Sequence, residues 1–222
     1  MALNGTTATL GDKAVPGQDV LEVDGIALEP AGELEYYALN KPTGVVSTAF
    51  DPQGRATVVE MVSAKAASQG RLFPVGRLDM NSTGLILLTN DGFLAHRLMH
   101  PRFGVPREYL LEVEPPPSRE DLARLRKGVT LEDGDTGPAK VSLVGTRGDR
   151  AQVGMVIHAG KKRQIRRSFE HLGKRVVSLN RVRIGSLGLG NLKPGEVRRL
   201  KPAEVDELYR QTGLEAWTHE GG

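Results

Sequence analysis

The sequence predicts an α+β fold built on a large mixed, mostly antiparallel sheet flanked by helices. Segments with strand-like patterns are interspersed with separate helical segments, without the strict strand–helix–strand alternation that a parallel sheet requires. No segment repeats at the period of a solenoid. The 222 residues are enough for one large domain, or for one domain with an appendage, and can bury a sizeable core.

Composition excludes several classes of protein. The chain has no cysteine, which excludes disulfides, zinc–thiolate sites and cysteine nucleophiles. No apolar run approaches the roughly 20 residues that span a bilayer. No charged segment followed by an apolar one opens the chain, as a secretory signal would. We therefore expect a cytoplasmic protein without membrane contact.

Residues 1–30 differ from the rest of the chain. Short strand-like segments are predicted at residues 7–10, 15–19 and 20–23, the last directly before Asp24-Gly25. This end is acidic, because seven acids stand against one base between Met1 and Glu35. Residues 33–222 are expected to form the main domain.

In the main domain, helices are marked by their ends and strands by their apolar patterns. Thr57 and Ser118 each begin a capping box, Pro101 ends a short amphipathic helix, and Gly173 is typical of the position after a helix. Helices are predicted at residues 57–66, 93–100, 118–127, 164–172 and 203–211. Strands are predicted at residues 36–39, 85–88, 107–113, 139–144, 152–158 and 176–184.

One carboxylate, Asp79, lies in a polar segment flanked by glycines, Gly76-Arg77-Leu78-Asp79-Met80-Asn81-Ser82-Thr83-Gly84. The apolar run at residues 85–88 is typical of a buried strand, and Asn90-Asp91-Gly92 is typical of the turn that ends it. An acid on a loop beside a core strand is placed to meet a ligand. The local alternative is that Asp79 caps a turn or pairs with Arg77.

Positive charge is concentrated near the C-terminal end, although the net charge is only +3. Between Lys161 and Lys201, thirteen bases stand against two acids, Glu170 and Glu196. Such a segment is expected of a protein that binds a phosphate backbone. A solvated basic face is the alternative.

Together these motifs resemble the signature of pseudouridine synthases, most closely the branch that modifies single sites in small-subunit (16S) or large-subunit (23S) ribosomal RNA. In that family the Asp of Gly-Arg-Leu-Asp is the catalytic nucleophile, which implies this role for Asp79. Lys41-Pro42 resembles the family's first motif, which supports the catalytic loop from beneath. Residues 107–133 are most similar to the large-subunit branch.

The resemblance implies an enzyme that flips out a specific uridine of ribosomal RNA and isomerises it to pseudouridine. Large-subunit 23S RNA is the favoured substrate. The alternatives are a small-subunit 16S synthase and a non-catalytic RNA-binding protein with the same fold. The family needs no cofactor. The expected partner is ribosomal RNA or a pre-ribosomal particle, and we expect a monomer.

A single carboxylate suits such an isomerase. A carboxylate can trap or stabilise the electron-poor sugar carbon when an N-glycosidic bond breaks. Ordinary glycosidases use two carboxylates, whereas only Asp79 is well placed in this sequence. An enzyme that rotates the base and reattaches it through carbon activates no water. The sequence leaves open whether Asp79 attacks C1′ of the ribose or removes the 2′ proton.

Two further motifs of the family imply the other catalytic residues. Arg107-Glu108-Tyr109 resembles the motif whose tyrosine stacks on the flipped base and relays a proton, which implies these roles for Tyr109. A core aromatic is the alternative for Tyr109. Gln164-Ile165-Arg166 resembles the third motif, so Arg166 is expected to pair with Asp79 and Ile165 to pack against the base pocket.

Neighbouring bases are expected to bind the RNA. They flank the predicted N-terminus of the helix at residues 164–172, and a helix N-terminus is itself a phosphate site. These residues are Lys161, Lys162, Arg163 and Arg167. By resemblance, Arg77 contacts RNA and helps to evict the target nucleotide, with a local ion pair as the alternative. No metal site is expected, because His96 and His100 have a suitable i, i+4 spacing but no third ligand.

Residues 1–30 resemble the C-terminal half of an S4-type RNA-binding domain. The resemblance rests on Leu3-Asn4-Gly5 and on the run from Gly17 to Gly25. The two basic helices that precede Asn-Gly in that domain are missing, either through truncation or through loss in this family member. We therefore expect a partial S4-like segment.

Overall fold

The computed structural model describes residues 1–9, 12, 14, 19–27, 33–66, 70–158 and 160–214. The chain forms two compact units, Met1–Leu34 and Glu35–Gly222. The boundary lies close to the one that the sequence predicts. Residues 15–18 lie outside the described residues; they include most of the strand expected at 15–19 and the first two residues of the run from Gly17 to Gly25.

The first unit is a four-stranded antiparallel sheet with the order β2-β1-β3-β4. Its strands are β1 (Ala2–Leu3), β2 (Thr6–Thr7), β3 (Leu21–Val23) and β4 (Ile26–Ala27). Two-residue turns join the pairs: Asn4-Gly5 has φ values of 51° and 78°, and Asp24-Gly25 has 53° and 77°. Asn-Gly and Asp-Gly favour this geometry because both turn positions need positive φ. The sequence placed the β2 strand too late, at residues 7–10.

The second unit contains a nine-stranded sheet, which confirms the predicted mixed, mostly antiparallel architecture. Its main order is β11-β12-β8-β13-β7-β5-β15, with β14 paired to β13 and β6 to β7. Only the β7–β13 pair is parallel among the described strands. The strands are β5 (Tyr36–Lys41), β6 (Phe73–Pro74), β7 (Thr83–Thr89), β8 (Arg107–Glu114), β11 (Lys140–Arg147), β12 (Arg150–Ile157), β13 (Arg175–Ile184), β14 (Leu187–Gly188) and β15 (Val197–Arg199). A separate hairpin pairs β9 (Thr130–Leu131) with β10 (Gly134–Asp135).

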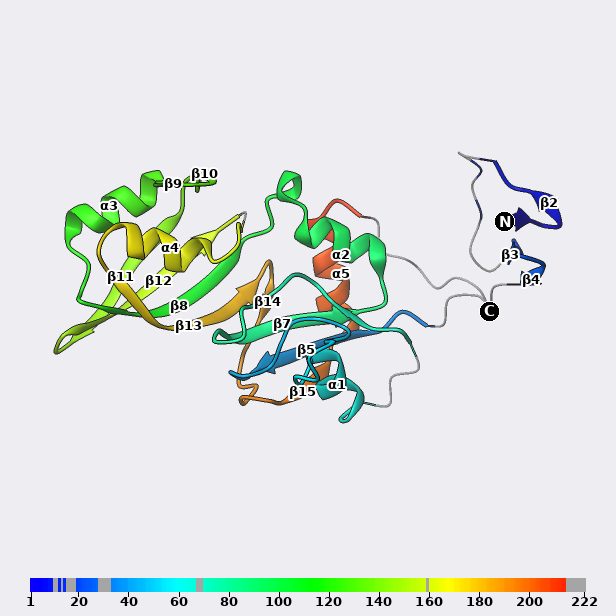
Figure 1. Ribbon diagram of the computed structural model, residues 1–222, viewed down its shortest axis with the longest axis horizontal. Helices are drawn as coiled ribbons and strands as arrows, with labels where there is room; N and C mark the ends of the chain where they lie inside the picture. Colours follow the sequence, from blue (N-terminus) through cyan, green and yellow to red (C-terminus); the bar gives the residue numbers. More distant parts are fainter. Residues whose placement is uncertain are drawn as a thin grey trace. The chain divides into compact units, whose positions relative to one another are not determined.

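Helices lie where the capping signals predict them. Thr57 and Ser118 each form the expected capping box, with Glu60 and Asp121 respectively. The helices are α1 (Val58–Ser63), α2 (Gly92–Met99), α3 (Arg119–Lys127), α4 (Gln164–His171) and α5 (Pro202–Gln211), with a 3₁₀ turn at Pro101–Phe103. Figure 1 shows α3 and α4 together over one face of β11, β12, β8 and β13. None of the helices in the described part of the chain is long and apolar enough to cross a membrane.

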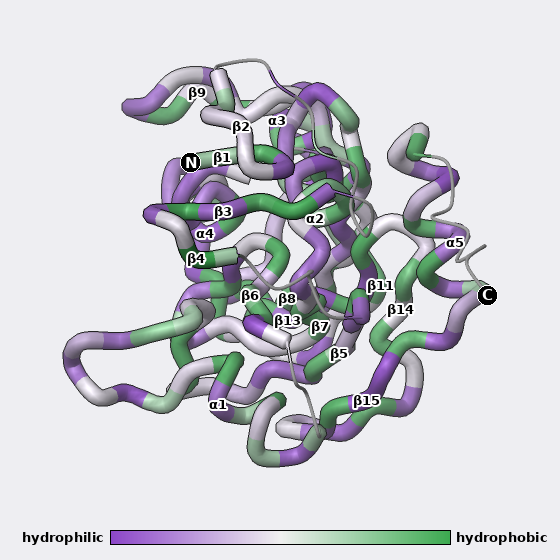
Figure 2. Tube along the Cα trace, turned by 90° about the vertical axis from the view of Figure 1, so that its right-hand side faces the viewer, coloured by the Kyte–Doolittle hydropathy of each residue, from purple (hydrophilic) through white to green (hydrophobic). Residues whose placement is uncertain are grey.

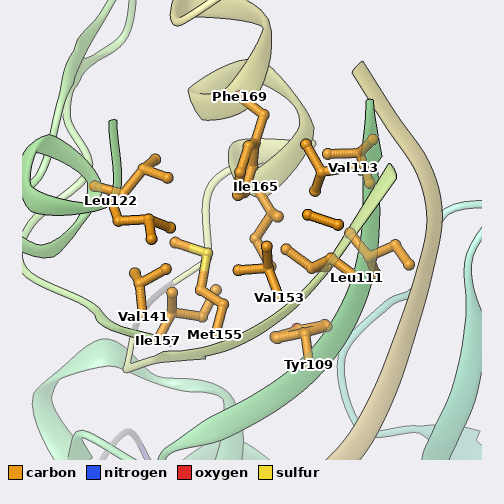
Figure 3. Close-up of a cluster of buried hydrophobic side chains, with 14 of the residues drawn as sticks. Tyr109, Leu111, Val113, Leu122, Val141, Val153, Met155, Ile157, Ile165 and Phe169 are labelled. Carbon is orange, nitrogen blue, oxygen red and sulfur yellow. The ribbon is translucent and has the colours of Figure 1, made fainter. Parts of the chain in front are cut away.

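Two apolar clusters hold this unit together. One fills the space beneath α3 and α4, where Ile165 and Phe169 point from α4 toward the strands and Tyr109 lies at the edge of the cluster (Figure 3). The other joins Val58 and Val62 of α1 to the strands β5 and β7. In Figure 2 the hydrophobic stretches run through the central strands, while the β9–β10 hairpin is largely hydrophilic. Each fully buried large apolar side chain contributes about 1.5–3 kcal/mol.

A buried polar network joins β5, α2 and α5. Asp91 is only 3% exposed and is the N-cap of α2, since its Oδ1 accepts from the Leu94 amide at 3.0 Å. Its Oδ2 accepts from the Tyr36 hydroxyl at 2.9 Å and from the Tyr209 hydroxyl. Burial and the bonded carboxylate raise the pKa of Tyr209 to about 12. Asp91 is therefore a structural acid that holds three elements together, and not merely a turn residue.

Candidate active site

Asp79 lies on the loop that enters β7, at the point where β7 meets β13. Gly76 and Gly84, at the ends of this loop, have φ values of 79° and 106°, which only glycine adopts without strain. At Gly84 the backbone of β13 leaves no room for a side chain, because an added Cβ would lie 2.3 Å from the Arg181 carbonyl oxygen. The two glycines thus fix the path of the loop.

The loop is held by hydrogen bonds to its backbone. Five consecutive carbonyl oxygens, from Leu78 to Ser82, each accept at least one hydrogen bond. The donors are Ser47 Oγ to Leu78 O (2.9 Å), the Ser82 amide to Asp79 O (2.9 Å), the Gly44 amide to Met80 O (2.9 Å), Arg166 Nη2 to Asn81 O (3.2 Å) and Lys41 Nζ to Ser82 O (2.8 Å). These bonds to five consecutive carbonyl oxygens restrict the loop backbone from which the Asp79 side chain projects.

Lys41 supports the loop from beneath, as the resemblance implies. It is completely buried, and its Nζ also donates to Pro42 O at 2.9 Å and to Met80 O at 3.3 Å. Burial lowers the pKa of Lys41 to about 8, while the nearby charge of Asp79 acts in the opposite direction. Lys41 therefore lies close enough to Asp79 to sense its charge.

The Asp79 carboxylate itself is accessible. Its side chain is 38% exposed, and its ion pair is with Arg163, whose Nη1 lies 3.9 Å from Oδ2. Arg77 is exposed and forms no ion pair within the described residues, so the local Arg77–Asp79 pair is not formed. Arg163 precedes α4 in a left-handed conformation, with φ of 52°, that no side-chain cap stabilises. The Asp79 carboxylate is thus loosely paired and open to a ligand.

The expected direct pair between Arg166 and Asp79 is not formed among the described residues, where Arg163 takes that place. Arg166 is 8% exposed, and its Nη1 and Nη2 donate to Val176 O at 2.7 Å and to Asn81 O at 3.2 Å. Burial and the charge of Arg163 lower the pKa of Arg166, whereas the charge of Asp79 raises it. Arg166 therefore binds the backbone two residues beyond Asp79 and acts on the carboxylate through space. Arg163, three residues before Arg166 and directly before α4, forms the ion pair with Asp79 that Arg166 was expected to form.

Tyr109 and Ile165 lie together beneath the loop. Both are buried, at 7% and 5% exposure, in the same cluster as Leu78, the residue before Asp79. Tyr109 on β8 is paired with Arg181 on the neighbouring strand β13. Arg181 is paired in turn with Gly84 on β7. A single row across three strands therefore connects the tyrosine with the end of the Asp79 loop. Tyr109 is a core aromatic and also a neighbour of the loop.

Comparison with known proteins identifies the family of this site. The sequence profile of the RNA pseudouridylate synthases matches residues 35–171. The chain belongs to this family.

Proteins that are similar to this one over most of its length support this assignment. Ribosomal large subunit pseudouridine synthase B of Bacillus subtilis is 39% identical over 208 residues, which cover 93% of this chain and 84% of that protein. The protein of the same name from Pseudomonas aeruginosa is 40% identical over 221 residues, which cover 96% of this chain and 56% of that protein. A crystal structure of a pseudouridylate synthase matches with a TM-score of 0.72 at 31% identity, covering 93% of this chain and 87% of that one. The enzyme is therefore an isomerase, and the non-catalytic alternative is set aside.

The bases around α4 of this pseudouridine synthase are not equivalent. Lys162 is exposed and forms no ion pair within the described part of the chain. Arg167 instead forms a bidentate ion pair with Asp133 at 2.9 and 2.8 Å, and Lys161 Nζ donates to Asp133 O at 2.5 Å. Two of the expected phosphate ligands are thus already occupied by the β9–β10 hairpin.

The basic segment between Lys161 and Lys201 does not form one uninterrupted surface. Arg166 and Arg181 are buried, and several other bases of the segment are paired with acids from elsewhere in the chain. These ion pairs are Arg167–Asp133, Lys174–Asp121, Arg175–Glu114, Arg183–Glu108 and Arg198–Glu204. Linear charge density overstates the positive surface, because folding brings distant acids to these bases.

Sequence reasoning missed Ser47 and Arg181. Ser47 Oγ both donates to Leu78 O and accepts from the Leu78 amide at 3.1 Å, which fixes the residue before Asp79. Arg181 is 2% exposed and its Nε donates to Leu85 O at 2.7 Å. Strand alternation places Arg181 and Arg183 on one face, but a register shift between them buries the first and exposes the second. No local sequence pattern predicts such a bulge.

No group of three metal-binding side chains occurs among the described residues.

Proposed function

We propose that this enzyme isomerises a specific uridine of ribosomal RNA, in the large subunit, with Asp79 as the nucleophile on a flipped-out uridine. The observation that carries the proposal is the state of Asp79, a partly exposed carboxylate on a loop in which the five carbonyl oxygens from Leu78 to Ser82 are hydrogen-bonded. Fixed backbone and open side chain are what a covalent or proton-transfer step requires. The names of the two relatives from Bacillus and Pseudomonas favour the large subunit.

The side chains around Asp79 have different roles in the proposed reaction. Tyr109 and Ile165 form the apolar floor, and the Tyr109 phenol stacks on the flipped base and relays the C5 proton. Arg163 and Arg166 supply positive charge on the α4 side of the carboxylate. Arg77 and Lys162, exposed beside it, bind phosphates of the RNA. Base flipping exposes the C1′–N1 bond to the acid.

Two chemical routes use the same carboxylate. In one, Asp79 bonds to C1′ as the C1′–N1 electron pair leaves with uracil. In the other, Asp79 removes the 2′ proton and the base leaves from C1′ to give a glycal. Deuterium at C2′ gives a primary isotope effect only in the second route, where the C2′–H bond breaks, so the size of the effect on 2′-deuterated RNA distinguishes them.

Residues 1–30 are proposed to be a partial S4-like segment that assists RNA contact. The support is the pair of short hairpins with Asn-Gly and Asp-Gly turns. Its acidic composition limits this segment to a minor part of the phosphate contact. Deleting residues 1–30 should therefore lower RNA affinity less than removing the charge of Lys162.

The test is chemical mapping of pseudouridine in ribosomal RNA from cells with and without the gene, complemented by wild-type or Asp79→Asn enzyme. One large-subunit position should lose its signal without the gene and regain it only with wild type. Loss of a small-subunit position instead would assign the enzyme to the 16S branch. Restoration by Asp79→Asn would contradict the role of Asp79.

A further inference from the structure

The β9–β10 hairpin places a carboxylate on cations that face the RNA site. Its turn carries Glu132 and Asp133, and Asp135 follows in β10. The Asp133 carboxylate binds Arg167 through both Nη atoms, at 2.9 and 2.8 Å. The Asp133 carbonyl oxygen accepts from Lys161 Nζ at 2.5 Å. One residue of the hairpin thus engages two bases at the start of α4.

This contact is accessible to solvent and therefore to RNA. The side chains of Asp133 and Arg167 are 44% and 28% exposed. Arg167 and, to a lesser degree, Lys161 lower the pKa of Asp133, so the carboxylate is ionised at neutral pH. An exposed ion pair of this kind contributes little to stability. A stronger or multivalent anion can therefore displace it.

Arg167 lies one helical turn from Arg163, the residue that pairs with Asp79. Arg163 and Arg167 are four residues apart at the start of α4, so they lie on the same side of the helix, one turn from each other. Arg163 faces Asp79, and Arg167 faces Asp133. A backbone phosphate next to the reacting nucleotide would reach the Arg167 fork, which binds carboxylate and phosphate with the same bidentate geometry.

The turn of the hairpin is exposed, whereas Val129 at its base is buried. Gly128 and Gly137 bound the segment, with φ values of 97° and 72°, and their backbones touch, since a Cβ on Gly128 would lie 2.7 Å from Gly137 O. Within the described part of the chain, one hydrogen bond besides those of Asp133 joins this segment to α4, from Gln164 Nε2 to Thr136 O at 3.2 Å. The Asp133 side chain can therefore exchange Arg167 for solvent while the base of the hairpin stays in place.

We propose that Asp133 is a specificity-determining residue of the RNA site: its carboxylate occupies Arg167 until a phosphate of correctly seated RNA replaces it. The proposal rests on the proposed function, because it takes the ligand at Asp79 to be RNA. Asp133 is then a repulsive element against RNA that does not present a phosphate at this point. Asp133 lowers the affinity of the enzyme for every RNA. It lowers the affinity for the substrate least, because a phosphate of the substrate replaces the carboxylate at Arg167.

The test is the affinity of purified enzyme for fluorescein-labelled oligouridylate, measured by anisotropy over a range of salt concentrations. Asp133→Asn should bind about two- to fivefold tighter than wild type. The slope of log affinity against log salt should steepen by about 0.7 for one added phosphate contact. Asp135→Asn is the matched control, because it makes the same charge change on the same hairpin, but among the described residues its carboxylate accepts from Thr130 Oγ1, at 2.6 Å, and from no base.

A double-mutant cycle links the gain to Arg167. Asp133→Asn should give no gain in the Arg167→Ala background, and Asp133→Ser should repeat the Asp133→Asn result in the native background. An unchanged or weaker affinity of Asp133→Asn, or an equal gain from Asp135→Asn, would overturn the proposal. The measurement needs no turnover, so absence of pseudouridine formation would count against the proposed function and leave this result standing.

Discussion

Asp79 and Asp91 lie twelve residues apart on either side of β7, yet the fold uses them in opposite ways. Asp91 is 3% exposed, and its oxygens accept from one backbone amide and two tyrosine hydroxyls. The Asp79 side chain is 38% exposed, and its one ion pair is 3.9 Å long. At Asp91 the protein satisfies the side chain, whereas at Asp79 it satisfies the backbone and leaves the side chain free.

This difference separates structural from reactive acids more clearly than residue type does. A buried carboxylate whose two oxygens both accept hydrogen bonds contributes to folding and is closed to a ligand. A carboxylate with a rigid backbone and few partners contributes little to folding and is ready to react. Substitution at each residue should therefore change one property and spare the other.

The largest expected effect is on turnover by Asp79→Asn. Loss of the only carboxylate assigned to the reaction should lower kcat by about 10⁴-fold or more, as for other nucleophiles. RNA affinity should stay within a few-fold, because the phosphate contacts are made by other residues. Single-turnover pseudouridine formation and filter binding measure the two. Near-normal turnover by Asp79→Asn would refute the assignment.

Arg166→Ala should come next, with a loss of about 10²-fold in kcat, because displacement of a positioned group by about 1 Å costs that much. The substitution removes the donor to Asn81 O and leaves the RNA-binding bases in place. Arg175→Ala is the matched control, since Arg175 is 68% exposed and paired with Glu114 away from the loop. Equal kcat values for the two variants would show that the Asn81 contact does not position Asp79.

Asp91→Asn should act on stability and not on chemistry. The amide keeps an acceptor for the Leu94 amide but offers an N–H group to two tyrosine hydroxyls, so buried hydrogen bonds to a charge are lost. The free energy of unfolding should fall by about 3 kcal/mol, which urea denaturation measures. A fall in kcat per folded molecule as large as that of Asp79→Asn would erase the distinction between the two acids.

The buried Lys41 beneath the Asp79 loop should make a smaller contribution to stability, and one that depends on pH. Its pKa is lowered from the usual 10.5 to about 8 in the folded protein. Between these values the unfolded chain binds more protons than the folded one, so stability due to Lys41 should rise as pH increases from about 8 to 10.5. The quantity to measure is the difference in unfolding free energy between wild type and Lys41→Met, which cancels the other groups. A difference that does not vary with pH would show that Lys41 keeps its ordinary pKa.

Much of the fold was predictable because it depends on local signals. Capping boxes at Thr57 and Ser118 located two helices, and apolar patterns located β7, β8 and β13. Asp79, Tyr109 and Lys41 were placed by motif, and the loop geometry around Lys41 agrees with its supporting role.

What sequence could not predict depends on long-range geometry. Whether Arg163 or Arg166 meets Asp79 is decided by how α4 begins, and Arg163 takes a left-handed backbone conformation there. The burial of Arg181 follows from a register shift in β13. The pairing of Arg167 with Asp133 joins residues 34 positions apart. Periodicity and motif spacing do not encode these contacts.

The decisive measurement compares Asp79→Asn with Asp91→Asn in one experiment that records both the urea midpoint and the pseudouridine formed per folded molecule. We predict that Asp79→Asn keeps the wild-type midpoint and forms no pseudouridine, while Asp91→Asn loses stability and retains turnover. If Asp79→Asn retains turnover, or if both variants lose stability and turnover together, the separation of a reactive from a structural acid is wrong.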